Sequence, residues 1–309
     1  MLIVELSRDN AVESQHRIWA AAVSPHGEVI GESVRGDANR LVFLRSAAKP
    51  FQATVGIESN VLQRFGLDER HLAIACASHN GSELHTSLVR EILDACGLDP
   101  TSLHCGNDGQ GGPLWHQCSG NHAWALATSV AHGWPVESYL DVDHPVQVAM
   151  NQHLAAYADA DVHLGRDNCG MCTHRLPLMA SARAFGRLAS APPHEPLGIV
   201  AAAMKKHPAL VRWDNEIDTI LMQLGCGYVA KVGAEGFLGI GTSDGRGIAL
   251  KIADGGIRAW RPAGAAAALA WLDPPAEIAT TLRKLLSETV LDAHEQPIGL
   301  LSCHTSELT

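Results

Sequence analysis

The sequence predicts an α+β fold in which strands near both chain ends complete one antiparallel sheet and helices lie between them. Residues 16–34 contain two apolar β-type runs around Pro25-His26-Gly27, a pattern typical of a hairpin. Residues 226–253 give three short strands separated by glycine turns, which indicates an antiparallel meander. Because helical patterns fill the region between them, we expect a single domain over residues 1–309 with a helical subregion at about 45–225.

The elements between the two strand regions have local signals of their own. The run HLAIACASHNG at residues 71–81 is predicted to be a buried strand that breaks at small and polar residues. Residues 82–97 follow with a serine cap, an acidic first turn, helical periodicity and a closing glycine, which together predict a helix. Further helices are expected at residues 119–133 and 144–158.

The C-terminal half adds two more expected elements. Residues 174–188, HRLPLMASARAFGRL, begin as an extended segment and become helical. Residues 274–290, PPAEIATTLRKLLSETV, predict the last long helix. No repeat or clear linker divides the chain.

Composition excludes several classes of function. Of 309 residues, 46% are hydrophobic and 18% charged, which is ordinary for a globular enzyme. The formal net charge of -10 makes nucleic acid or an anionic membrane surface an unexpected partner, since both require a basic face. No apolar stretch approaches the roughly 20 residues of a membrane span. With no leader-like start, we expect a cytoplasmic protein.

Cysteine and histidine usage gives weaker information. Eight cysteines in a chain of this kind indicate free thiols or metal ligands rather than disulfides. Several lie inside apolar runs and are expected to pack as small core residues, as Cys76 does. The 17 histidines are mostly isolated in the sequence, and an isolated histidine is more often structural than catalytic.

The segment RSAAKP at residues 45–50 has the spacing of a nucleophile and its base. If Ser46-Ala-Ala-Lys49 opens a helix, Ser46 and Lys49 lie one turn apart on the same face. A lysine in a dry pocket can lose its proton and then activate the serine hydroxyl. An ordinary polar first turn explains the tetrapeptide equally well, so the rest of the chain must decide.

Two further apolar segments contain a polar residue with possible chemistry. Ser78 ends the run at residues 71–78, where it is a second nucleophile, a proton relay or a simple turn residue. Lys251 stands in an alternating apolar strand, GIALKIA. It either protects a sheet edge or points into a cleft with a shifted pKa.

Cysteines in two loops suggest a possible metal site. Cys118 precedes an apolar helix in CSGNHA, and Cys169 and Cys172 form a CxxC in DNCGMC. A CxxC is a metal or redox half-site, but a second pair at finger-like spacing is missing. A mixed site from Cys118 and Cys169 and a set of buried thiols both remain open.

Taken together, these motifs resemble a known family. SxxK followed by proline, then ASHNG, CSGNHA, DNCG, DTILM, AKVGAEG and GRGIALKIADG occur in one order along nearly the whole chain. They resemble the bacterial asparaginase II family of the Rhizobium etli inducible type, the class 3 asparaginases. The resemblance implies a serine β-lactamase or penicillin-binding-protein-like fold, in which SxxK places the serine and its lysine at the start of a helix.

The resemblance also implies roles for single residues. It implies two catalytic serine-lysine pairs, Ser46 with Lys49 and Ser78 with Lys251. Near the substrate it implies Arg45, as partner of the α-carboxylate, and His122. Other implied positions are Cys118 and Cys169 as ligands of a zinc ion and Asp167 beside the metal, where its carboxylate could accept the substrate α-ammonium.

The chain departs from the family pattern in the metal loops. Asn121 stands where the family has a lysine that binds the metal, and an amide oxygen is a weaker zinc ligand. Asn168 replaces a glycine, and Met171-Cys172 replaces a hydrophobic residue and proline. Zinc is therefore expected at low occupancy, or held by Cys172 in place of the lysine, and no organic cofactor is expected.

These observations lead to one function and two alternatives. We expect an amidohydrolase that converts L-asparagine to aspartate and ammonia through a serine acyl-enzyme, as a homodimer acting on a small molecule. Either serine could be the one acylated. The alternatives are hydrolysis of another small amide or a β-lactam-like ring, and a non-catalytic metal-binding or metal-storing homologue.

Overall fold

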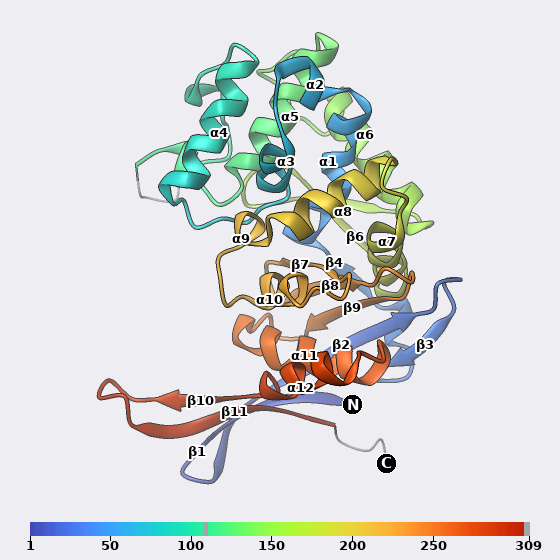
Figure 1. The fold of residues 1–309 in the computed structure, drawn as a ribbon, viewed down its shortest axis with the longest axis vertical. Coiled ribbons are helices and arrows are strands. Elements are labelled where there is room, and N and C mark those ends of the chain that lie inside the picture. The colour runs from blue at the N-terminus through green and yellow to red at the C-terminus, as the bar shows by residue number, and fades with distance from the viewer. Residues whose placement is uncertain (108–110, 306–309) are drawn as a thin grey trace.

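The computed structural model describes residues 1–107 and 111–305. Figure 1 shows a helical region above a large antiparallel sheet, with further helices against the sheet. The predicted α+β class is confirmed, as is the sheet completed by both chain ends, because β1 (Leu2–Arg8) pairs with β11 (Pro297–Thr305). Within the described ranges no helix has the length and apolar character needed to cross a membrane.

The large sheet has eight antiparallel strands. The two chain ends supply β10 (Ser287–Leu291), β11, β1, β2 (Ala11–Val23) and β3 (Val29–Glu32), which pairs with β2. The predicted meander forms the other side, in the order β9 (Gly247–Ile252), β8 (Phe237–Gly241) and β7 (Val229–Gly233), with β9 next to β2. Strands from both ends of the chain thus hold the meander in place.

A second, three-stranded sheet lies between the large sheet and the helices. Its order is β4 (Leu41–Phe43), β6 (Cys172–Pro177) and β5 (His163–Arg166), all antiparallel. The predicted change from an extended to a helical segment within residues 174–188 is confirmed, since α7 (Leu178–Ser190) follows β6 directly.

The helices divide between the upper region and the two faces of the large sheet (Figure 1). Those of the upper region are α1 (Lys49–Glu58), α2 (Val61–Phe65), α3 (Glu69–Ala75), α4 (Glu83–Ala95), α5 (Ser119–His132), α6 (Pro145–Ala158), α8 (Pro196–Lys206) and α9 (Pro208–Val211). The others are α7 on one face of the sheet and α10 (Ile217–Gln223), α11 (Trp260–Trp271) and α12 (Ala276–Lys284) on the other.

Side chains that point alternately to the two faces of the large sheet form two hydrophobic cores. On β2, Ala21 and Val23 face the core shared with α7 and the upper helices, whereas Ala20 and Ala22 face the core shared with α10 and α11. Successive side chains of a strand point to opposite faces, so a sheet covered on both sides must be apolar on both. This explains the uninterrupted apolar runs of the meander, whose strand β8 is buried throughout.

The glycines of the meander allow α7 to approach the sheet closely. A Cβ atom on Gly241 would lie 1.9 Å from the backbone oxygen of Phe185, and one on Gly247 would lie 1.9 Å from that of Ala182. Backbone atoms cannot turn away from such a contact, so these positions require glycine. The glycines predicted as turn residues therefore also set the distance between helix and sheet.

Two predicted elements are wrong. Residues 69–75 form the helix α3, not a buried strand, because Asp68 caps the segment and completes a capping box with His71. The helix predicted over 274–290 ends at Lys284, and residues 287–291 form the edge strand β10.

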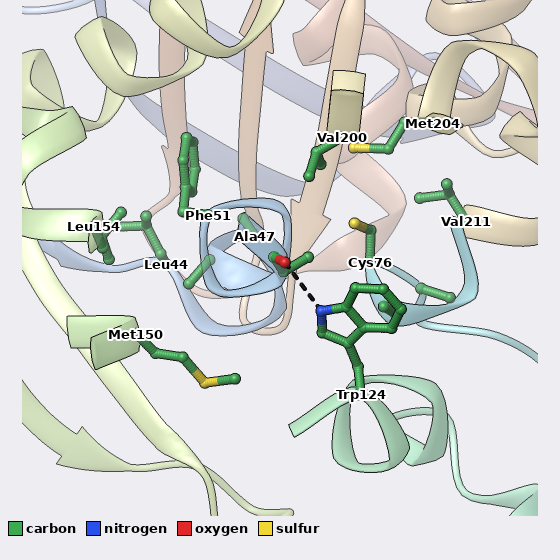
Figure 2. Packing of buried hydrophobic residues seen from close by; sticks show 14 of the residues in the cluster. Leu44, Ala47, Phe51, Cys76, Trp124, Met150, Leu154, Val200, Met204 and Val211 are labelled. Atoms are coloured by element: carbon green, nitrogen blue, oxygen red, sulfur yellow. Dashed lines mark hydrogen bonds between the residues drawn. The ribbon is translucent and has the colours of Figure 1, made fainter. Parts of the chain in front are cut away.

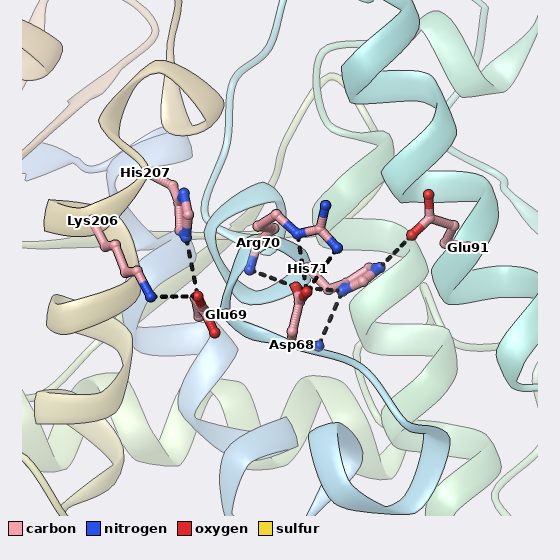
Figure 3. Close-up of polar contacts among 7 residues, drawn as sticks. All are labelled: Asp68, Glu69, Arg70, His71, Glu91, Lys206 and His207. Carbon is pink, nitrogen blue, oxygen red and sulfur yellow. Dashed lines mark hydrogen bonds and ion pairs between the residues drawn. The ribbon is translucent and has the colours of Figure 1, made fainter.

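Polar contacts fix α3 to its neighbours (Figure 3). The His71 ring contacts Asp68 at 2.9 Å and Glu91 of α4 at 3.0 Å. At the same end, Glu69 accepts a hydrogen bond of 2.7 Å from Lys206 of α8. Surface pairs of this kind each contribute little to stability, but together they orient the helix that leads to Ser78.

The core beneath the first predicted motif is tightly filled (Figure 2). Phe51 of α1 is fully buried and contacts Phe185 of α7 edge to face, with ring centroids 5.2 Å apart. The Trp124 indole donates a hydrogen bond of 2.9 Å to the carbonyl of Ala53. The start of α1, which carries the serine-lysine motif, is thereby held rigidly against α5 and α7.

Candidate active site

Most of the predicted site residues line one cavity of about 310 Å³. It lies where the start of α1, the loop after α3, the loops before α5 and β6 and the β7–β8 turn meet. Its lining includes Arg45, Ser46, Ser78, Cys118, Asp167, Asn168, Cys169, Arg212 and Glu235.

Ser46 lies in a tight turn that enters α1. Residues Arg45–Ala48 form a 3-10 turn, and the backbone N–H of Lys49 donates to the carbonyl of Ser46. Ser46 is half-buried and faces the cavity, while Lys49 is only 3% exposed. The structure therefore confirms that Ser46 and Lys49 lie one turn apart at the start of a helix.

Strand β7 runs directly against this turn because it carries a glycine there. A Cβ atom on Gly233 would lie 1.9 Å from the carbonyl oxygen of Leu44, the residue before Arg45. This close approach brings Lys231, two residues earlier on the same strand and therefore on the same face, to the serine site.

Ser78 lies between two lysines. Its Oγ is 3.5 Å from Lys49 Nζ and 3.3 Å from Lys231 Nζ, and its side chain is 2% exposed. Its backbone N–H donates to the carbonyl of Val211 at 3.0 Å, which fixes the loop. Lys49 also donates to the carbonyl of Ala77 at 2.5 Å. One hydroxyl thus connects two lysine side chains.

The environment of Lys231 favours its neutral form. The side chain is fully buried, and burial lowers the pKa of Lys231 to about 7. Asp218 opposes this shift from 3.7 Å, but that carboxylate also accepts a hydrogen bond from the backbone N–H of Val232. Because desolvation outweighs the carboxylate, a large fraction of Lys231 is unprotonated at neutral pH.

The predicted pairing of Ser78 with Lys251 is wrong. Lys251 Nζ donates to the carbonyls of Glu235 and Ile252, the latter at 2.7 Å, and lines a separate cavity. The neighbour of Ser78 is Lys231, twenty residues earlier and on β7. Both lysines interrupt apolar strands of the same meander, but Lys231 lies on β7 and Lys251 on β9, with β8 between the two strands.

Arg45 and Asp167 bind each other at the cavity edge. The guanidinium makes a bidentate contact with the carboxylate, 2.9 Å from Nε and 2.8 Å from Nη2, and each side chain is 15% exposed. The hydrogen bond with Asp167 raises the pKa of Arg45. Arg45 also donates to the side-chain oxygen of Asn168 at 3.1 Å. Arg45 adopts a left-handed backbone conformation, with φ of 52°, that turns it toward Asp167.

His122 lies apart from the cavity lining. Its ring is fully buried, its Nδ1 is 2.6 Å from the Tyr139 hydroxyl, and burial lowers the pKa of His122 to about 3. Its Nε2 has no hydrogen-bond partner within the described residues. The contacts found do not bring His122 to the substrate position that the sequence suggested.

The donor set at the two cysteine loops does not fit a four-coordinate zinc ion. Cys118 and Cys169 hydrogen-bond to each other, which lowers the pKa of Cys118 and raises that of Cys169. Over residues 1–107 and 111–305, no three histidine, cysteine, aspartate or glutamate side chains gather closely enough to hold a metal. Asn121 is buried with its amide nitrogen unpartnered there. Two thiols and an amide leave a zinc site incomplete.

Cys172 does not complete this set. It begins β6, its thiol hydrogen-bonds with the Asn151 side chain, and it lines a different cavity from Cys118 and Cys169. The expectation that Cys172 could turn inward to replace the lysine ligand is therefore not supported by its contacts.

Sequence reasoning missed Lys231, Asp218 and Arg212. The motifs AKVGAEG and DTILM contain the first two, and their signal was a charged residue inside an otherwise apolar segment. Arg212 is 8% exposed, reaches the cavity and is bonded through Nε to Glu216 at 3.0 Å.

Comparisons with known proteins give one family match and several distant structural likenesses. A family model described as L-asparaginase II matches residues 4–303. No match appears among curated proteins. A β-lactamase from Mycobacterium bovis is similar over 82% of this chain and 94% of that chain, at 15% identity and a TM-score of 0.44. Mglu is similar over 76% of this chain and 61% of its own, at 12% identity and a TM-score of 0.44. Mglu in its glutamate form gives 76% and 56%, at 12% identity and a TM-score of 0.43.

Proposed function

The chain belongs to the L-asparaginase II family, and from that premise we propose that it hydrolyses the side-chain amide of L-asparagine through an acyl-enzyme on Ser46. The observation that carries the mechanism is the contact of one serine hydroxyl, Ser78 Oγ, with two lysines, one of which has its pKa lowered to about 7. A neutral amine next to a buried hydroxyl is what base-assisted serine chemistry requires.

Exposure assigns different tasks to the two serines. Both serines line the cavity, but Ser46 is the more exposed of the two and can reach a substrate carbonyl carbon, which supports it as the nucleophile. Ser78 is 2% exposed and bonded to both lysines, so it relays protons. The serine of an SxxK motif is the nucleophile in β-lactamases and penicillin-binding proteins, which supports the assignment of Ser46.

The reaction then proceeds in two steps. Lys49, one turn from Ser46, takes the hydroxyl proton while a proton passes on through Ser78 to the neutral amine of Lys231, and the serine oxygen forms a bond to the amide carbon. The Lys49–Ser78–Lys231 chain then donates a proton, through the Ser78 hydroxyl, to the leaving nitrogen. The C–N bond breaks and ammonia departs. Water attacks the ester while the same chain accepts one of its protons. The C–O bond to Ser46 then breaks, the chain returns that proton to the Ser46 oxygen, and aspartate is released.

The Arg45–Asp167 pair is complementary to an amino-acid zwitterion. We propose that the substrate α-carboxylate binds Arg45 and the α-ammonium binds Asp167, each replacing part of the existing ion pair. Both charges of the pair already line the cavity with Ser46.

The direct test is hydrolysis by the purified protein, measured as ammonia release for the two amino-acid amides and as ring opening for a β-lactam. L-Asparagine, L-glutamine and a β-lactam are compared under identical conditions, and asparagine is expected to give the highest kcat/KM. Preference for another amide would move the assignment to that substrate. No turnover of any of them would refute the proposed function.

The pH dependence of turnover is expected to follow Lys231. Below pH 7 this lysine is an ammonium, so the relay cannot accept a proton, and above it the amine is free. The kcat for asparagine should therefore rise about tenfold per pH unit on the acidic side and level off above neutrality. Steady-state rates from about pH 5 to about pH 9 measure this. A flat profile would show that a group other than Lys231 controls the chemistry.

Asp167→Asn is expected to remove the preference of the enzyme for substrates that carry an α-ammonium group. The comparison uses succinamate, which is asparagine without its α-amino group. The wild type should prefer asparagine by about tenfold or more in kcat/KM, the value of one charge-assisted hydrogen bond. In Asp167→Asn this preference should vanish, whereas the exposed control Asp94→Asn keeps it. An unchanged preference in Asp167→Asn would place the ammonium elsewhere.

We also propose that the protein carries less than one zinc ion per chain. Asn121 and two thiols that hydrogen-bond to each other, those of Cys118 and Cys169, form an incomplete donor set. Elemental analysis of purified wild type should give a substoichiometric value, unchanged in Cys172→Ala. Asn121→Lys should raise it by supplying an amine. Full occupancy in the wild type would refute this proposal.

A further inference from the structure

A second cavity of about 260 Å³ opens beside the catalytic one and shares Arg45 and Glu235 with it. It lies between the two sheets. From the large sheet come Trp19 and Lys251, which are direct cross-strand partners on β2 and β9. From the small sheet come Phe43 and Arg175, which are partners on β4 and β6.

Each sheet therefore contributes one aromatic ring and one cation. The Arg175 guanidinium carbon lies 5.8 Å from the Phe43 ring centroid. Trp19 is held by Arg40, whose guanidinium carbon lies 4.1 Å from its ring centroid. The result is a hollow with flat apolar sides and two positive charges.

The two cations of this cavity have unused hydrogen-bonding capacity. Lys251 donates to two backbone carbonyls, those of Glu235 and Ile252, and an ammonium has three N–H groups. Arg175 has no acidic partner among the described residues, and its Nε is buried without a hydrogen-bond partner there. Of the remaining charges in the described lining, Arg45 is bonded to Asp167, and Glu235 is the acid that lines the cavity with Arg175 and Lys251. An excess of positive charge remains.

We propose that this cavity is a subsite for the carboxylate of an extended amide substrate, namely a β-aspartyl peptide whose leaving amine carries the carboxylate. The inference rests on the proposed function. If the substrate α-groups occupy Arg45 and Asp167, the amide nitrogen is the position from which a substrate can extend. The shared residues Arg45 and Glu235 place the second cavity directly beside the catalytic one.

The reaction on such a substrate follows the same two steps as the reaction on asparagine. The Ser46 oxygen bonds to the β-carbonyl carbon, the C–N bond breaks, and the leaving amine takes the proton relayed by Ser78. Water then releases aspartate from the ester. Glycine, in the case of β-aspartyl-glycine, replaces ammonia as the first product.

The test measures binding by calorimetry in a Ser46→Ala background, which cannot form the acyl-enzyme. The probes are β-aspartyl-glycine and β-aspartyl-glycinamide, which differ in one carboxylate. The acid is expected to bind about tenfold more tightly, since it gains charge-assisted hydrogen bonds. Adding Lys251→Gln or Arg175→Gln should abolish this difference, and adding Lys251→Arg or the exposed control Lys284→Gln should preserve it.

Several results would overturn the subsite. These are equal affinity for the two peptides, no binding of either, or a difference that survives both Lys251→Gln and Arg175→Gln. The two substitutions lie on different sheets, and circular dichroism melting identifies a variant that fails to fold. Asparagine turnover by the wild type is measured in parallel. Its absence would refute the proposed function alone, because the affinity difference is read without catalysis.

Discussion

Lys231→Met is expected to lower kcat for asparagine by about 10³-fold, the usual contribution of a positioned general acid-base group. Lys231 is one of two amines in contact with Ser78, and its pKa of about 7 makes it the proton acceptor of the relay at neutral pH. Methionine has a similar length but cannot exchange a proton. KM should change little, since Lys231 is fully buried behind Ser78.

The control for this substitution is Lys284→Met, an exposed lysine of α12 that should leave turnover unchanged. Thermal melting checks the fold, because the change leaves Asp218 without its 3.7 Å partner. That carboxylate keeps its hydrogen bond from Val232. A folded Lys231→Met protein with near wild-type kcat would remove Lys231 from the mechanism.

Ser46→Ala is expected to lower kcat by at least about 10⁴-fold and to abolish covalent trapping, since it removes the nucleophile. Ser78→Ala should also reduce turnover, by about 10²-fold or more, because the relay between the lysines is interrupted. The two variants differ in acylation. The Ser78→Ala variant keeps the Ser46 hydroxyl. It should therefore accumulate an ester on Ser46 when the substrate has a leaving group that needs no proton.

Mass spectrometry after reaction with an activated aspartyl ester makes this distinction. The wild type and Ser78→Ala should carry the added mass on the peptide that contains Ser46, and Ser46→Ala should carry none. An adduct on the Ser78 peptide instead would exchange the roles of the two serines. Thr289→Ala, which removes an exposed hydroxyl on β10, is the control and should be labelled like the wild type.

The serine-lysine motif was predictable because its geometry is local. Ser46 and Lys49 are three residues apart, and any helical or 3-10 turn brings them to one side. Proline after Lys49 favours a helix start at that point. Nothing distant is needed to place the pair, and the structure confirms its spacing.

Lys231 was not predictable in the same way because its position depends on the order of strands. Both Lys231 and Lys251 follow apolar residues in strands of one meander, and sequence alone does not tell which strand borders the serine turn. Gly233 decides it, since the absence of a side chain lets β7 contact Leu44. That contact joins residues almost two hundred positions apart, beyond the reach of any local pattern.

The helix α3 shows a different limit. Its run of apolar residues is too short for periodicity to separate a helix from a buried strand. The capping box of Asp68 and His71 lies just before the run, and its histidine takes the position usually held by glutamate or glutamine. Contacts with Glu91 and Lys206, both distant in sequence, then fix the helix.

The pairing of β1 with β11 and of β2 with β9 has a consequence for synthesis of the protein. The first three strands leave the ribosome with the apolar face of Leu2, Val4 and Ile18 uncovered, because α11, which packs against it, ends only at Trp271. At about 5–20 residues per second this interval lasts on the order of 10 to 50 seconds. The nascent N-terminal hairpin is thus exposed to binding by chaperones, and the sheet that supports Lys231 closes only once most of the chain has been translated.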